Sequence, residues 1–311
     1  MRVRQSSEMA LVAPAPETPT ITTGTRTTMA MSKRPPAFNA KLLDSLTLPQ
    51  TVDVSFDLPV KDTTSEYDVH EMLGRGSTSV VYACTRKEAG TVVGEEARSN
   101  TLESTDRTSR ATKTEVAPAV APRNNFALKI FSKHMLDPVQ RRKVLQEIAV
   151  MRTFAKAHGR KYVVELMDAY QDNDRVVLIL ERVQGGDLFD RISSMDHYSE
   201  QSAMRCMREI FNGLHFLHTH GVVHRDIKPE NILLLNRNDD FHIKIADFGE
   251  SATVRYGQTI SETVGTLPYM SPEVTLAIPY SYPVDVWSAG VVCFAILSGE
   301  LPFDSTASFA P

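Results

Sequence analysis

A polar segment in the second half of the chain, His224–Asn231 (HRDIKPEN), contains residue types that could do chemistry together. Asp226 can accept a proton, Lys228 can hold an anion, and Asn231 can offer an amide oxygen to a hard cation. The aliphatic run Ile232–Leu235 follows directly and predicts a buried strand. The polar residues therefore lie in a loop directly before a strand, and proteins often place functional side chains in such loops.

A second polar segment, IADFG, supplies Asp247, and a hairpin-like stretch, LLLNRNDDFHIKI, separates it from the first. Mg²⁺ takes a few oxygen ligands from the protein and completes its coordination with substrate phosphates and water. Asp247 together with Asn231 would supply such oxygens if the hairpin brings the two segments close to each other. The alternative is that they are two unrelated surface loops.

A glycine-containing turn, LGRGS, lies between two stretches with strand character, in residues 67–87. Gly74 and Gly76 would let the backbone approach a phosphate and aim N–H groups at it. A dinucleotide-binding fold would need a helix after the glycines, whereas VVYAC predicts a strand. The turn alone is a weak signal, because many such turns are plain hairpins.

The elements around these segments form a β-rich half and then a mainly helical half. FALKIF and residues 162–183 predict three strands, and residues 137–157 predict a helix with Asp137 as its cap and Pro138 at its first position. A second helix is predicted from the cap Ser199, because apolar residues recur there at helical spacing until a glycine stops it.

Composition limits the classes of function. The chain has 311 residues, 42% of them hydrophobic, and a net charge of −4, which gives no reason to expect nucleic-acid binding or membrane adhesion. Cys84, Cys206 and Cys293 show no disulfide or metal-ligand spacing and favour a reducing, cytoplasmic setting. The longest apolar region, Val286–Leu297, is shorter than the about 20 residues that span a bilayer.

Two parts of the chain differ from the rest in amino-acid composition. Residues 1–65 are rich in Thr, Pro, Ala and Ser and predict a disordered extension, although early arginines leave a transit peptide open. Residues of about 88–125 have a similar low-complexity composition and predict an insertion between two strands. Such an insertion is tolerable because loop entropy grows only logarithmically with length.

From about Tyr67 to the C-terminus the chain resembles a eukaryotic protein kinase domain, whose signature motifs match these segments. It is most similar to the calcium/calmodulin-dependent group of Ser/Thr kinases, in GGDLFDRI, GLHFLHTHGVVHRDIKPENILLL, IADFG and DVWSAGVVCFAILSGELPF. The resemblance implies an α+β, bilobal fold. A small β-rich lobe and hinge would cover residues 66–183, and a larger helical lobe would cover 184–311.

The resemblance implies ATP and Mg²⁺ as cofactors and protein substrates with Ser or Thr acceptors. Asp226 would accept the proton of the substrate hydroxyl, and Lys228 would steady the transferring phosphoryl group. Lys129 is either an edge-strand lysine with its head in solvent or the lysine that holds the α- and β-phosphates and pairs with Glu147. Asn231 and Asp247 would ligate Mg²⁺.

The nucleotide site and the core around it also follow from the resemblance. The residues implied to surround ATP are Leu73, Gly74, Gly76, Val81, Ala127, Lys129, Glu181, Val183 and Leu233. Ser79 stands where the family has a third glycine. Leu180 would be the gatekeeper, and a stacked spine would contain Met151, Leu166, His224 and Phe248. Asp285 resembles the buried helix aspartate that holds the catalytic-loop backbone.

Specificity and regulation are further implications. Thr266 with Lys228 resembles the Ser/Thr-directed pattern, and the acidic positions Asp187 and Glu230 predict substrates with basic motifs. Many relatives carry a phosphorylated residue four positions before the threonine, where this chain has a glutamate. The residues of this regulatory prediction are Arg225, Ser261, Glu262, Thr263 and Thr266. An ion pair between Glu262 and Arg225 would partly order the loop without phosphorylation. Ser261 and Thr263 are alternative phosphosites.

The C-terminal end leaves two functions open. The family continues with further helices after GELPF, so the second lobe is expected to be partial and to expose apolar surface. A calmodulin-binding or autoinhibitory tail would lie beyond the chain. The two functions are an active Ser/Thr kinase and a nucleotide-binding scaffold that lacks transfer activity.

Overall fold

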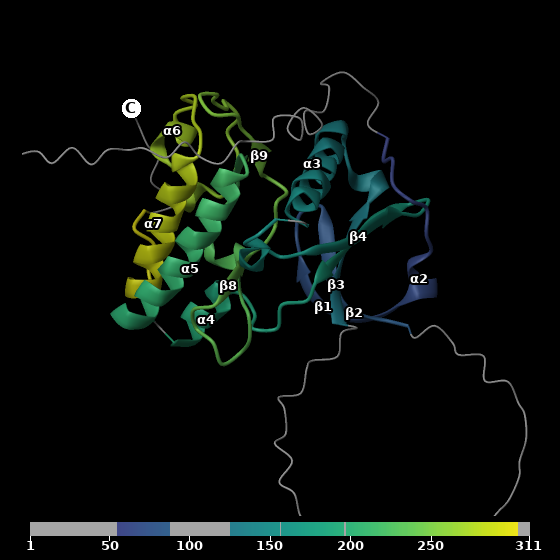
Figure 1. The fold of residues 1–311 in the computed structure, drawn as a ribbon, viewed down its shortest axis with the longest axis horizontal. Coiled ribbons are helices and arrows are strands. Elements are labelled where there is room, and N and C mark those ends of the chain that lie inside the picture. Colours follow the sequence, from purple (N-terminus) through teal and green to yellow (C-terminus); the bar gives the residue numbers. More distant parts are fainter. Residues whose placement is uncertain (1–54, 88–124, 156, 196, 304–311) are drawn as a thin grey trace, which may run out of the picture. The chain divides into compact units, whose positions relative to one another are not determined.

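The computed structural model describes residues 55–87, 125–155, 157–195 and 197–303, all of which belong to one compact unit, Phe38–Pro311. A β-rich lobe with one long helix comes first along the chain, and a mainly helical lobe follows it (Figure 1). The expected α+β, two-lobed arrangement is therefore confirmed.

The first lobe is built on an antiparallel sheet with the strand order β1-β2-β3-β5-β4. Its strands are β1 (Tyr67–Arg75), β2 (Ser79–Arg86), β3 (Asn125–Ser132), β4 (Leu166–Gln171) and β5 (Arg175–Glu181). Apolar, largely β-branched residues dominate β5, and four consecutive members of that strand are buried because both faces of the sheet are covered there. Lys129 lies on the central strand β3, so the edge-strand alternative is wrong.

Helix α3 (Pro138–Phe154) lies against this sheet (Figure 1). Its start is fixed locally, because the Asp137 side chain accepts from the Gln140 backbone and the Gln140 side chain accepts from the Asp137 backbone. This capping box, with a proline at the first helical position, confirms the predicted start. The helix buries one face, which contains Val144, Ile148 and also the charged Glu147.

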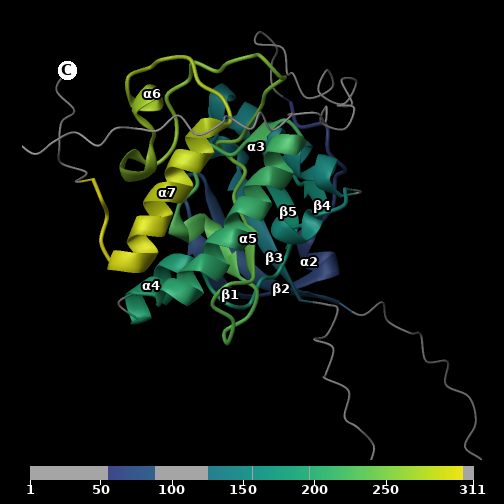
Figure 2. The same ribbon diagram turned by 60° about the vertical axis from the view of Figure 1, so that its left-hand side comes forward.

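The second lobe packs its helices around one large apolar core. Its helices are α4 (Leu188–Met195), α5 (Glu200–Thr219), α6 (Pro272–Thr275) and α7 (Pro283–Ser298). Its short strands pair as β6 (Val222–Val223) with β9 (Ala252–Thr253), and β7 (Ile232–Leu234) with β8 (Ile243–Ile245). Helices α5 and α7 lie side by side (Figure 2). The Ser199 cap of α5 and the β7–β8 hairpin are confirmed.

Short 3-10 helices complete the connections: η1 (Lys133–Met135), η2 (Arg160–Tyr162), η3 (Pro229–Asn231) and η4 (Leu267–Tyr269). Several apolar side chains of the second lobe are exposed along α7, among them Val286, Phe294 and Leu297. Exposed apolar surface on this lobe was expected from the sequence. All three cysteines are free, and two of them, Cys84 and Cys206, are buried.

Some residues of the predicted N-terminal extension belong to the described fold. The disordered extension was expected to reach residue 65, but residues 55–62 contact the sheet and α2 (Thr63–Glu66) follows them. The sequence shows only a short apolar alternation there, Phe56 and Leu58, and the residues that these side chains contact are distant along the chain. Residues 1–54 and 88–124, which hold the rest of the predicted extension and the insertion, lie outside the described residues, and Asn125 belongs to β3.

No helix in the described part of the chain is both long enough and apolar enough to cross a membrane.

Candidate active site

The backbone of the loop between β6 and β7 is hydrogen-bonded to one buried carboxylate. Asp285, which is fully buried near the start of α7, accepts from the backbone N–H groups of His224 and Arg225, both at 2.8 Å. His218 also contacts this carboxylate at 2.8 Å. The two backbone bonds fix the loop that carries Asp226, as the resemblance implied for Asp285.

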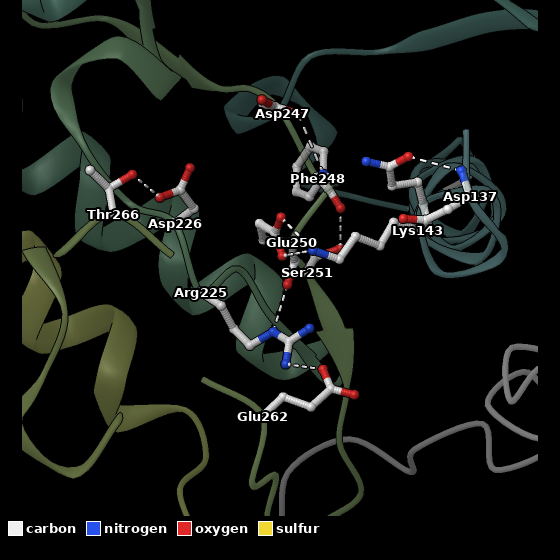
Figure 3. A network of polar contacts seen from close by, with 12 residues as sticks. Asp137, Lys143, Arg225, Asp226, Asp247, Phe248, Glu250, Ser251, Glu262 and Thr266 are labelled. Atoms are coloured by element: carbon white, nitrogen blue, oxygen red, sulfur yellow. Dashed lines mark hydrogen bonds and ion pairs between the residues drawn. The ribbon is translucent and has the colours of Figure 1, made fainter. Parts of the chain in front are cut away.

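The Asp226 carboxylate is oriented by three neighbouring side chains. Thr266 Oγ1 donates to Asp226 Oδ1 at 2.6 Å (Figure 3), and Lys228 Nζ lies 2.8 Å from Asp226 Oδ2. The Asn231 side-chain amide donates to the backbone oxygen of Asp226 at 2.8 Å and to Oδ2 at 3.0 Å. Lys228 also donates to Thr266 Oγ1 at 2.8 Å, so the two residues of the Ser/Thr-directed pattern are in contact.

A second charged cluster joins the sheet, helix α3 and the loop after β8. Lys129 Nζ donates to Glu147 Oε1 at 2.7 Å and to Asp247 Oδ1 at 2.8 Å. Lys129 and Glu147 are only 7% and 2% exposed, so their contact is a buried ion pair. Three residues far apart in the sequence therefore converge, as the kinase resemblance implied for Lys129 and Glu147.

The charge states in this cluster follow from burial and from these contacts. Burial acts to lower the pKa of Lys129, but the two carboxylates outweigh it and raise that pKa above its ordinary value. The positive charge of Lys129 lowers the pKa of Asp247 to about 2, so this carboxylate is ionised at neutral pH. Burial raises the pKa of Glu147, and Lys129 opposes that rise.

The backbone is strained at two of these functional positions. Arg225 and Asp247 have φ angles of 68° and 60°, and Ala277 is the remaining non-glycine residue with positive φ in the described ranges. Such conformations cost energy and persist only where their surroundings impose them. Behind Asp247, the buried Phe248 lies 5.3 Å from the His224 ring and shares the large core with Met151 and Leu166. The predicted spine residues thus lie in one packed region.

The two oxygen donors predicted for Mg²⁺ fit a hard cation chemically. Asp247 is an ionised carboxylate, and the NH₂ group of Asn231 is committed to Asp226, so the amide oxygen of Asn231 is the atom left for a ligand. Both come from loops next to the β7–β8 hairpin. Their chemistry suits a cation that takes its other ligands from phosphates and water.

Most of the predicted nucleotide residues lie on the strands β1, β2, β3, β5 and β7, and Gly76 and Val183 lie just after β1 and β5. Gly74 pairs with Val81 across β1 and β2, and Ala127 pairs with Leu180 across β3 and β5. Val183 and Leu233 pack against the core of the second lobe, and the side chain of Leu73 is half-exposed on β1. A Cβ atom at Gly74 would meet nothing within 4 Å, so packing within the chain does not require glycine there. The predicted role of Gly74 in phosphate binding stays a prediction.

The loop after Asp247 is tied to Arg225, as predicted from Glu262. Arg225 Nη1 donates to Glu262 Oε2 at 2.9 Å, and Arg225 Nε donates to the Glu250 backbone oxygen at 2.5 Å (Figure 3). Tyr280 Oη donates to the Glu262 backbone oxygen at 2.5 Å. The side chains of the alternative phosphosites, Ser261 and Thr263, are exposed.

Two ion pairs near the site were missed by sequence reasoning. Lys143 of α3 donates to both carboxylate oxygens of Glu250 at 2.7 and 2.8 Å (Figure 3), which links α3 to the loop that Arg225 holds. The buried Lys244 lies 2.8 Å from the Glu181 carboxylate behind the hinge. Both pairs join residues far apart along the chain, and no local pattern marks them.

The five-stranded sheet with its single long helix, the helical lobe and the charged cluster between them define a bilobal kinase fold. The family model of the protein kinase domain matches residues 112–310, which is more than half of the chain. The chain belongs to the protein kinase family.

Curated relatives are calcium-dependent protein kinases of plants. Calcium-dependent protein kinase 29 of Arabidopsis thaliana is 36% identical over 249 residues, which are 79% of this chain and 39% of the relative. Calcium-dependent protein kinase 8 of Oryza sativa subsp. japonica is 36% identical over 244 residues, which are 78% of this chain and 38% of the relative. The chain spans about two fifths of the length of these relatives.

Proposed function

We propose that the chain transfers the γ-phosphoryl group of ATP to Ser or Thr hydroxyls of proteins. The observation that carries this proposal is the Asp226 carboxylate, oriented by Thr266 at 2.6 Å and lying 2.8 Å from Lys228. The substrate oxygen forms a bond to the γ-phosphorus, the bond from that phosphorus to the β–γ bridging oxygen breaks, and ADP leaves. Asp226 accepts the hydroxyl proton, and Lys228 offsets negative charge on the transferring group.

Lys129 and Glu147 position the nucleotide in this proposal. Lys129 is held between the carboxylates of Glu147 and Asp247. It would donate to the α- and β-phosphates, while Glu147 would keep its ammonium group in place. Asn231 and Asp247 would hold Mg²⁺, which neutralises phosphate oxygens when it is bound. The adenine ring would lie among Val81, Ala127 and Leu233, next to the hinge.

The acidic residues beside the site support a preference for basic substrates. Burial raises the pKa of Asp187, and the carboxylates of Asp190 and Glu230 raise it further because like charges repel. Asp187 also accepts from the Asp190 backbone at 2.8 Å and so caps α4. A cation from a substrate arginine would relieve the repulsion among these carboxylates.

We expect the chain to phosphorylate a Ser peptide that carries upstream arginines and, more slowly, the same peptide with those arginines replaced by alanine. A matched Tyr peptide should receive no phosphate, and chelation of Mg²⁺ should abolish transfer. Initial rates with labelled ATP measure all four cases. If the chain binds ATP·Mg²⁺ but labels no peptide, it is a nucleotide-binding scaffold. Equal rates with and without the arginines would contradict only the basic preference.

We also propose that Glu262 orders the loop without phosphorylation, through Arg225. Glu262→Gln should lower the transfer rate a few-fold, because an exposed ion pair contributes little and Glu262 is 69% exposed while Arg225 is buried. Cleavage of the 250–265 loop by protease should become faster in this variant. Added salt screens the ion pair and should also make cleavage of the wild-type loop faster. Glu300→Gln is the matched exposed control. Unchanged rate and unchanged cleavage in Glu262→Gln would refute this role.

The relatives are calcium-dependent by name, and on that ground we propose calcium control of the whole protein. It would act through calmodulin or a regulatory tail outside the described residues. We also propose a cytoplasmic location, which the reduced cysteines favour.

A further inference from the structure

A short segment before the sheet is anchored in the core of the first lobe. In the N-terminal edge segment, residues 55–61, Phe56 and Leu58 are only 7% and 8% exposed, whereas Ser55 and Asp57 are exposed. This alternation is the pattern of a strand with one buried face. The two apolar side chains share a cluster with residues of α3 and of the strands β3, β4 and β5.

The backbone of the N-terminal edge segment pairs with the free edge of the sheet. β4 ends the strand order, and Val60 forms a parallel bridge with Gln171 at its end. The Gln171 N–H donates to Pro59 O at 2.9 Å, and the Lys61 N–H donates to Gln171 O at 3.0 Å. The Gln171 side chain donates to the backbone oxygens of Phe56 and Leu58 at 2.6 and 2.9 Å.

The same segment touches the helix that carries Glu147. Val144 and Ile148 of α3 belong to the cluster of Phe56 and Leu58, and the Arg141 guanidinium lies 5.9 Å from the Phe56 ring centroid. Ile148 is the neighbour of Glu147 in the sequence, so the buried face of α3 that meets the segment is continuous with the face that reaches Lys129. Movement of α3 away from the sheet would expose both apolar side chains.

We propose that the N-terminal edge segment is a positioning device that seats α3, with Phe56 and Leu58 as its anchors. With the segment docked, Glu147 reaches Lys129; with it released, α3 has fewer contacts and the pair opens more often. ATP affinity then falls in proportion to the fraction of molecules with the pair closed. This proposal rests on the proposed function for its effect on transfer, but its effects on α3 and on nucleotide binding are independent of transfer.

The test uses the full chain with Phe56→Ala/Leu58→Ala, and Asp57→Ala as the matched control from the same segment. We expect the double variant to bind ATP·Mg²⁺ about ten-fold more weakly if the closed fraction drops to about a tenth, and to show faster hydrogen exchange in α3. A synthetic peptide of residues 51–62 should restore both properties, and the same peptide with both alanines should not. Asp57→Ala should behave as wild type.

The outcomes separate this proposal from simple destabilisation and from failure of the proposed function. If the double variant melts at a lower temperature and the peptide restores neither ATP binding nor α3 protection, the segment only adds stability and the proposal is wrong. If the double variant does not fold, Leu58→Ala alone undergoes the same test, with Leu58→Met as the conservative rescue. Wild-type protein that transfers no phosphate contradicts the proposed function, while binding and exchange still decide the role of the segment.

Discussion

Asp226→Asn should lower kcat for phosphoryl transfer by about 10²- to 10⁴-fold, the usual contribution of a positioned general base. The amide cannot accept the hydroxyl proton, yet it has nearly the shape of the carboxylate. Its oxygen can still accept from Lys228 and Asn231, and its NH₂ group can donate to Thr266 after that hydroxyl turns. We therefore expect the thermal stability and the affinity for ATP·Mg²⁺ to change little.

Steady-state kinetics beside a binding titration would measure this effect. Asp174→Asn makes the same chemical change at an exposed aspartate in the turn between β4 and β5, and it should retain wild-type kcat. A kcat within ten-fold of wild type in Asp226→Asn would rule out the proposed proton acceptor. Equal loss of ATP binding and transfer would instead place Asp226 in nucleotide binding.

Lys129→Met should abolish most transfer and also destabilise the protein, because the Glu147 carboxylate would remain buried without its partner. Breaking a buried ion pair on one side costs about 3–5 kcal/mol. The second change Glu147→Gln removes the orphaned charge. The double variant should therefore recover much of the lost stability but none of the transfer. Denaturant melts of the single and double variants, with parallel rate assays, separate these two consequences.

The pH dependence of Lys129→Met has a definite sign. A buried carboxyl without its lysine has a higher pKa in the folded state than in the unfolded state, so the folded state binds more protons between those two values. The free energy of unfolding should therefore rise as pH falls from 8 towards 5, and this slope should vanish in the Glu147→Gln double variant. Lys87→Met, which removes an exposed ion pair, should cost no more than about 1 kcal/mol and show no such slope.

Short sequence motifs predicted the helix starts that are fixed by neighbouring residues. Asp137 and Pro138 marked the start of α3, and Ser199 marked the start of α5, because caps act within one turn of the helix. The hairpin between the two polar segments followed from residues close together in the chain. The contact of Lys129 with Glu147 depends on the tertiary structure, and it was predicted from the resemblance to a family. The contact of Lys129 with Asp247 was not predicted.

Long-range contacts between ordinary residue types escaped prediction. Phe56 and Leu58 are two apolar residues in a short segment, and nothing near them identifies α3 and β4 as their partners. The Lys143–Glu250 pair joins two residues that each resemble common surface charges. The roles of the nucleotide, metal and regulatory residues stay predictions until the variants are measured.

The register of β2 and β3 has a consequence for protein engineering. Thr85 and Asn125 are paired across these strands, so the two ends of the connection between them lie side by side whatever its length. The entropy of closing a connection grows only logarithmically with its length, so lengthening it changes stability little. A fluorescent domain whose own termini are close together could therefore be spliced between residues 87 and 125. Because β3 carries Lys129, such a fusion would place an optical reporter at the end of the strand that holds this buried ion pair.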